Sequence, residues 1–179
     1  MDAKKICITS ALFLIILLSV MGFSLNHAYA PRTEYLRIHI RADSNAADAQ
    51  EVKFRVKDAV VEYLTPFVAD CDTEKKAEQM LFERLPEIVK VANAVLRENG
   101  FAYTAKASVT TEEFPTRNYG DLTLEKGFYR ALIIELGSGK GDNWWCVVYP
   151  PLCFTGEGGY VYRSKILEII RKFRGKNQI

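Results

Sequence analysis

The chain has 179 residues, a formal net charge of +2 and two histidines. Such a near balance of charge argues against a nucleic-acid-binding protein that relies on a basic stripe. His39 is the only histidine after the N-terminal segment, and the cysteines are widely spaced, so we expect no zinc site.

The N-terminal 30 residues have the features of an export signal. Two lysines precede Ile6–Phe23, an uncharged run of 18 residues, and Ala28-Tyr29-Ala30 supplies the small residues of a cleavage site. Pro31 directly after that site disfavours cleavage, and the apolar run approaches the length of a membrane-spanning helix. We therefore expect an exported protein in which residues 1–30 are a signal peptide or a membrane anchor. Residues 31–179 are expected to form a single globular domain.

Residues 35–41 alternate between apolar and basic side chains, which predicts a strand with one buried face. The expected buried face carries Leu36, Ile38 and Ile40, and the expected polar face carries Arg37, His39 and Arg41.

Two helices are predicted next. Asn45 is a candidate N-cap for a helix over residues 46–64, which Thr65-Pro66 is expected to end. A second helical pattern begins at Thr73 and stops at Asn99-Gly100. Pro86, inside this pattern, either kinks the helix or opens a new one.

The second half of the chain is predicted to be mainly strands. They cover residues 102–110, 128–136 and 144–149, and Pro150-Pro151 ends the last of them. Residues 160–173 are interpreted as a short strand running into a basic amphipathic helix. Together these elements predict an α+β fold, with a helical hairpin packed on a largely antiparallel sheet of about four to five strands and a C-terminal helix.

No combination of residues predicts catalysis. Any mechanism with a histidine base must use His39, and the sequence places no nucleophile against it. Gly137–Gly141 lacks the spacing of a phosphate-binding loop and is interpreted as a hairpin turn. We expect no catalytic residues, metal or cofactor, and by elimination a binding or signalling protein; a hydrolase that uses His39 remains the less favoured alternative.

Three cysteines follow the leader, namely Cys71, Cys146 and Cys153. An odd number in an exported protein means a free thiol, an intermolecular bridge or three buried thiols. Cys146 and Cys153 flank the double proline and are candidates for a disulfide if the chain doubles back there.

Several motifs resemble the stage II sporulation protein R family. The most specific is Asn143–Phe154, which matches that family's Asn-Trp-Trp-Cys…Pro-Pro-Leu-Cys-Phe signature almost residue for residue. The other similar segments, in the same order, are His39–Asn45, Asp48-Ala49-Gln50, Val56–Val60, Phe114–Gly120 and Ser164–Glu168. Lys57 stands where the family usually has arginine, so no functional role is assigned to it.

The resemblance implies a non-catalytic signalling role. A protein of this family is exported into the space between the forespore and mother-cell membranes. There it triggers a membrane-embedded aspartic protease, which removes the pro-sequence of sigma factor E.

Four residues are candidates for the protease contact, because tryptophan, tyrosine and arginine dominate the energetics of protein interfaces. They are Arg117, Tyr119, Trp144 and Trp145. The alternative for the tryptophans is a place in the core. A cell-wall- or membrane-binding domain is the other functional alternative, based on the basic residues Arg163, Lys165, Arg171, Lys172, Arg174 and Lys176.

Overall fold

The computed structural model describes residues 12–19, 32–120, 122–154 and 160–176. The chain divides into two units, Met1–Pro31 and Arg32–Ile179. Residues 12–19 are helical, and the rest of the expected leader lies outside the described residues. Among the helices described here, none combines the length and the apolar character needed to cross a membrane.

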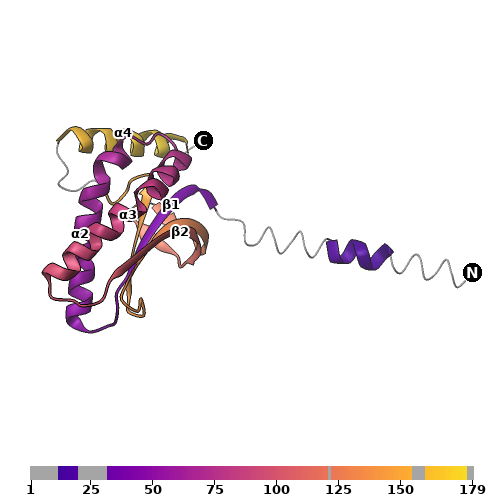
Figure 1. Ribbon diagram of the computed structural model, residues 1–179. Coiled ribbons are helices and arrows are strands. Elements are labelled where there is room, and N and C mark those ends of the chain that lie inside the picture. Colours follow the sequence, from indigo (N-terminus) through magenta and orange to yellow (C-terminus); the bar gives the residue numbers. More distant parts are fainter. Residues whose placement is uncertain (1–11, 20–31, 121, 155–159, 177–179) are drawn as a thin grey trace, which may run out of the picture. The chain divides into compact units, whose positions relative to one another are not determined.

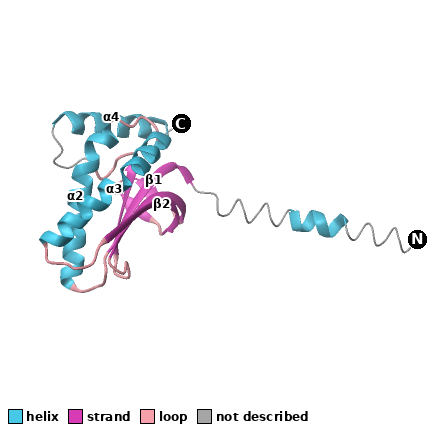
Figure 2. Cartoon of the chain, in the orientation of Figure 1, coloured by secondary structure: helices cyan, strands magenta, loops and turns pink. Residues whose placement is uncertain are grey.

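The larger unit is built on a mixed sheet, drawn in magenta in Figure 2. Its four strands lie in the order β2-β5-β1-β6. Its strands are β1 (Arg32–Arg41), β2 (Ala105–Phe114), β5 (Gly127–Leu136) and β6 (Asn143–Tyr149). Strand β1 runs parallel to β5, whereas β1–β6 and β2–β5 are antiparallel. The predicted α+β class and the largely antiparallel sheet are therefore confirmed.

Two long helices, α2 (Ala47–Ala69) and α3 (Glu74–Glu98), form the predicted hairpin and cover one face of this sheet (Figure 1). The main core lies between these helices and the sheet. It includes Ile38 and Ile40 of β1 and Val56 and Val60 of α2. Helix α4 (Tyr160–Lys176) packs against α2. The central strand β1 is thus held between two neighbouring strands and beneath two helices.

The prediction that Thr65-Pro66 ends the first helix is wrong, because α2 continues through Pro66 to Ala69. Leu64 and Val68, four residues apart, are both fully buried, so burial of this face offsets the roughly 3 kcal/mol that an interior proline costs. Asn45 is not the N-cap either, since Ala46 occupies that position without a side-chain hydrogen bond.

Helix α3 agrees more closely with its predicted limits. The hydroxyl of Thr73 accepts a hydrogen bond from the Lys76 N–H, which caps the first turn. The helix passes through Pro86 as one element and ends at Asn99, after which Gly100 adopts a φ of 80°. A residue in that left-handed conformation is a common helix stop, and glycine adopts it without a steric cost.

The C-terminal segment differs from its prediction. Residues 160–176 are helical from their first residue, where a short strand was expected. Ile166 and Ile170 are both buried in the main core. Their separation of four residues is the spacing of a helix face and not of a strand.

The face of β1 expected to be polar and exposed is in fact buried. Arg37 and His39 have no exposed surface. A second, smaller cluster on this face contains Tyr35, Phe114 and Tyr129, and a hairpin absent from the predictions packs against it. That hairpin consists of β3 (Arg117–Tyr119) and β4 (Leu122–Leu124). Arg37 and His39 are therefore enclosed by aromatic residues, whereas Arg41, the third basic residue of this face, remains partly exposed.

Candidate interaction site

The centre of the candidate site is His39, in the middle of β1. Its imidazole stacks on Trp145 of β6, with ring centroids 4.6 Å apart and planes 28° from parallel. Its Nε2 lies 2.9 Å from Oε2 of Glu112. Glu112 belongs to β2, so its side chain crosses the intervening strand β5 to reach the histidine.

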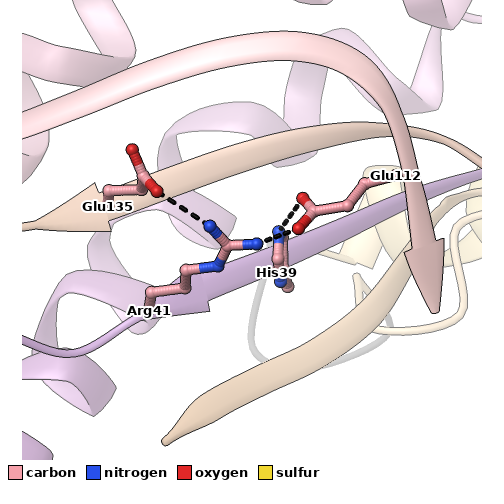
Figure 3. A network of polar contacts seen from close by, with 4 residues as sticks. All are labelled: His39, Arg41, Glu112 and Glu135. Atoms are coloured by element: carbon pink, nitrogen blue, oxygen red, sulfur yellow. Dashed lines mark hydrogen bonds and ion pairs between the residues drawn. The ribbon is translucent and has the colours of Figure 1, made fainter. Parts of the chain in front are cut away.

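A chain of charges continues from this pair along the sheet (Figure 3). Arg41 binds the second oxygen of Glu112 through Nη2, and its Nη1 donates to Oε1 of Glu135 at 2.8 Å. Three strands contribute to this network, and its outer members are partly exposed, with Glu135 at 40%. Because both carboxylates share one guanidinium, the network fixes Arg41 and orients Glu112 toward the histidine.

His39 is neutral in this setting. Its burial, together with the positive charges of Arg41 and Arg37, lowers the pKa from 6.5 to about 3. A neutral imidazole that faces a carboxylate must carry its proton on Nε2, so Nε2–H donates to Glu112. Nδ1 is buried and has no hydrogen-bond partner among the described residues. The hydrogen bonds of His39 thus join it to a carboxylate, and the described part of the chain brings no hydroxyl or thiol nucleophile to it.

Arg37 lies two residues earlier on the same face, within an aromatic cage. Its guanidinium carbon is 4.2 Å from the ring centre of Phe114 and 4.8 Å from that of Tyr129. Its Nη2 donates to the hydroxyl of Tyr119 at 2.8 Å, whereas Nε and Nη1 find no hydrogen-bond partner in the described part of the chain. Burial lowers the pKa of Arg37 below its ordinary value, and contacts with the aromatic rings partly offset this cost.

The structure brings three of the four candidate contact residues together. Arg117 is exposed, and its guanidinium carbon lies 5.7 Å from the ring centre of Trp145. Tyr119, on the same hairpin strand, is half-buried through its bond to Arg37. Trp145 is also half-buried, and its ring contacts both Arg117 and His39. These three residues belong to one continuous set of side chains.

Trp144 is separated from this set. Neighbouring residues on a strand point to opposite faces, so Trp144 lies on the helix side of the sheet, where it packs against the main core. There Lys57 of α2 places its ammonium group 5.9 Å from the ring centre of Trp144. Lys57 therefore has a packing role beside a tryptophan, which an arginine would also fill.

A surface hollow of about 420 Å³ adjoins Arg117 and Trp145. Gly141, Asp142 and Asn143, at the start of β6, line the rest of it. The hollow therefore combines an exposed guanidinium, one face of an indole ring and the main chain where a strand begins.

The double-proline segment returns toward the sheet. Cys146 and Cys153 are joined by a disulfide with their Cα atoms 6.3 Å apart, and the peptide between Tyr149 and Pro150 is cis. Phe154 is 1% exposed and belongs to the main core. Cys71 is a free, buried thiol, and burial raises its pKa to about 11, so it stays protonated at neutral pH.

The Asp-Ser-Asn run after β1 has a structural role. Asp43 accepts two hydrogen bonds from Ser138. The Ser138 N–H donates to the Asp43 carboxylate at 2.7 Å, and the Ser138 hydroxyl donates to the Asp43 main-chain oxygen at 2.6 Å. Asn45 Oδ1 accepts from the Asp142 N–H at 2.6 Å. The two side chains thus join the β1–α2 loop to the β5–β6 turn and hold the rim of the hollow.

Sequence reasoning missed two important members of the site, Arg37 and Glu112. Arg37 was assigned only to a polar face, and Glu112 lay outside the predicted strand. Strand geometry places Glu112 on the same face as Phe114, two residues further on, but the buried positions of β2 change face between Val109 and Phe114, so the alternation gave no clear signal.

No metal centre accompanies these residues: the described ranges hold no group of three or more histidine, cysteine, aspartate or glutamate side chains arranged to bind an ion. Of the basic residues behind the wall- or membrane-binding alternative, the side chains of Arg163, Lys165 and Lys176 lie outside the description. Lys172 pairs with Glu168 at 2.7 Å, and Arg171 and Arg174 are exposed.

The fold and the site together define a small α+β domain in which buried Arg37 and His39 bond to partly buried side chains, beside an exposed arginine and a half-buried tryptophan. The chain belongs to the stage II sporulation protein R family, whose model matches residues 32–158. Stage II sporulation protein R of Bacillus subtilis (strain 168) is 35% identical over 119 residues, which cover 66% of this chain and 53% of that relative. The chain thus spans about half the length of that relative. No solved structure matches the chain.

Proposed function

We propose that this chain is an exported signalling protein of sporulation. In this proposal it activates a membrane-embedded aspartic protease of the mother-cell membrane, which then processes the precursor of sigma factor E. The observation that carries the proposal is membership of the stage II sporulation protein R family across residues 32–158. This is a role for a protein ligand and not for an enzyme.

The organisation of the chain supports this role. The apolar N-terminal segment would engage the export machinery and deliver the domain into the space between the forespore and mother-cell membranes. At the candidate site, the only histidine of the domain is buried against a carboxylate and held neutral. A buried network of this kind suits a rigid surface for recognition better than a catalytic centre.

We propose Arg117, Tyr119 and Trp145 as the protease-contacting surface. The exposed guanidinium and the half-buried indole offer the residue types that dominate protein interfaces. The connections of Tyr119 to Arg37 and of Trp145 to His39 hold both aromatic side chains in place before binding, which lowers the entropy cost of association. Trp144, on the other sheet face, is assigned to packing.

Reconstitution in a non-sporulating host tests this function. The host co-expresses the full chain, the membrane protease of the same organism and the sigma factor precursor, and processing appears as a decrease in the size of the precursor. We expect processing only when the chain is present with its N-terminal segment, and a version lacking residues 1–30 serves as the control. Absence of processing, with the protease present and the chain exported, would contradict the proposal.

A matched pair of variants then locates the contact. Arg117→Ala is expected to reduce processing about ten-fold, in line with loss of an interface arginine. Arg55→Ala removes an arginine that is also exposed, but from helix α2, and is expected to leave processing unchanged. Equal effects of the two changes would show that the proposed surface is not the contact.

A further inference from the structure

At the surface of the site, Arg117 is an exposed cation with no carboxylate partner among the described residues. Glu112 and Glu135, the acidic residues of the network on this sheet face, are both engaged by Arg41. The guanidinium of Arg117 lies over the ring of Trp145, and no ion pair or hydrogen bond from a described residue reaches it. An exposed arginine held over an indole keeps its planar donors free, and such a fork matches a carboxylate geometrically.

Strand β6, beside Arg117, is the last strand of the described sheet on its side. Its second half is covered, because every residue from Cys146 to Tyr149 is buried and Cys153 is bonded to Cys146. Its first half, Asn143–Trp145, is only half-buried and opens into the hollow that Arg117 lines. The accessible strand edge and the unpaired cation therefore meet at one place.

We infer that this open end of β6 receives an extended, acidic segment of the protein partner. In this arrangement the segment pairs by main-chain hydrogen bonds with Asn143–Trp145 and directs an aspartate or glutamate to Arg117. Strand addition at a sheet edge supplies affinity through the main chain, and a side-chain contact supplies specificity. The inference rests on the proposed function, since it specifies how the partner proposed above is bound.

Charge complementarity selects an acidic partner over a basic one. The other charged wall of the hollow is Asp142, whose carboxylate accepts a hydrogen bond from the Asn45 side chain at 3.4 Å. Asp142 therefore has a neighbour within the chain, whereas no described carboxylate pairs with Arg117, whose guanidinium instead faces the like charge of Arg37. A basic segment would leave Arg117 facing a like charge, which costs affinity.

The opposite edge of the sheet provides a matched control. Strand β2 is the last strand on that side, and Lys106 on it is exposed, as Arg117 is. Lys106 is not among the residues that line the hollow at β6. Changes at Lys106 thus alter a strand edge and a positive charge without touching the proposed contact.

Photo-crosslinking in the reconstituted system tests the inference. A photoreactive amino acid replaces Asn143 or, in a separate strain, Lys106, and the full chain is exported alongside the membrane protease and the precursor. We expect the variant at position 143 to cross-link to the protease and the variant at 106 not to do so. Mass spectrometry of the cross-linked peptide should identify a protease segment that contains aspartate or glutamate. Exposed Lys140, in the adjoining turn, is the second position to label if the change at Asn143 itself stops processing.

Charge reversal provides the second arm. Arg117→Glu should lower processing about ten-fold or more, Lys106→Glu should leave it unchanged, and replacing the cross-linked acid of the protease by lysine should restore processing with Arg117→Glu. Processing without cross-links at 143 and 140, cross-links to a segment lacking acids, or no rescue would overturn this inference and leave the proposed function standing. No processing by the unaltered, exported chain would overturn both.

Discussion

Trp145 covers His39: the two rings stack with centroids 4.6 Å apart, and the histidine beneath has no exposed surface. The tryptophan signature and the histidine motif, separated by about one hundred residues in the sequence, are therefore parts of one packed unit. The indole excludes water from the histidine, and Arg117 lies against the same indole. Any partner that contacts Arg117 and Trp145 thus meets a surface supported by buried His39 and its partly exposed charge network.

The first prediction concerns the pH dependence of stability. The pKa of His39 is 6.5 in an unfolded reference and about 3 in the folded protein, so the unfolded state binds a proton first as the pH falls. The folded protein should therefore lose stability between pH 6.5 and 3, by about 2 kcal/mol at pH 5 relative to pH 7.

Urea unfolding of the unaltered domain and of His39→Gln at several pH values measures this effect. Glutamine retains a donor for Glu112 but does not titrate, so the difference in unfolding free energy between the two proteins should change with pH by this amount. A difference that stays constant from pH 7 to pH 5 would show that His39 is not held neutral.

The second prediction concerns the buried pair of Arg37 and Tyr119. Tyr119→Phe removes the acceptor of the only hydrogen bond that the structure gives the Arg37 guanidinium. The domain should lose about 2 kcal/mol, because a buried cation then lacks any hydrogen-bond acceptor. In an Arg37→Met background, the same Tyr119→Phe change should cost almost nothing.

Denaturant unfolding of the four proteins of this double-mutant cycle gives the coupling energy directly. Additive effects of the two changes would mean that the guanidinium and the hydroxyl do not interact. Arg37→Met alone should be tolerated, since methionine fills the cage without burying a charge.

Whether an element could be predicted from the sequence depends on whether its interactions are local or join distant parts of the chain. The long helices and the central strands were predictable because burial on one side gives a regular spacing, as in α3 with its cap at Thr73 and its stop at Gly100. The hairpin of β3 and β4 was not predicted, since strands of three residues are too short to show a period.

The interior of the site depends on contacts that the local pattern does not encode. Glu112 pairs with His39 across 73 positions of the sequence, and it does so over an intervening strand. A glutamate on a half-exposed strand face is ordinarily solvated, so only the sheet order identifies it as a partner. The parallel pairing of β1 with β5 brings these residues together, and periodicity alone does not predict strand order.

The third prediction concerns the disulfide. The bridge between Cys146 and Cys153 closes a loop with a sequence separation of 7, which corresponds to about 2.5 kcal/mol of stabilisation in the chain-entropy model. Addition of a reductant should lower the unfolding free energy by this amount in the unaltered protein and in Cys71→Ala. The double variant Cys146→Ala, Cys153→Ala should be insensitive to reductant, and a loss of sensitivity in Cys71→Ala would assign the bridge to another pair.

The fourth prediction tests the clamp between the β1–α2 loop and the β5–β6 turn. Gly137 and Gly120 adopt similar left-handed conformations, with φ of 57° and 64°. A Cβ at Gly120 meets nothing within 4 Å, whereas one at Gly137 would lie 2.3 Å from Oδ1 of Asp43. Gly120→Ala should therefore cost only the backbone strain, about 1 kcal/mol.

Gly137→Ala should cost about 3 kcal/mol, because the same strain is joined by displacement of Asp43 from the Ser138 N–H. Thermal or urea unfolding of both variants measures the difference. In Asp43→Ala the obstructing carboxylate is absent, so the additional cost of Gly137→Ala should disappear and the two glycine changes should become equal. If the difference persisted in that background, contact with Asp43 would not be its cause, and the clamp would have to depend on other atoms of the turn.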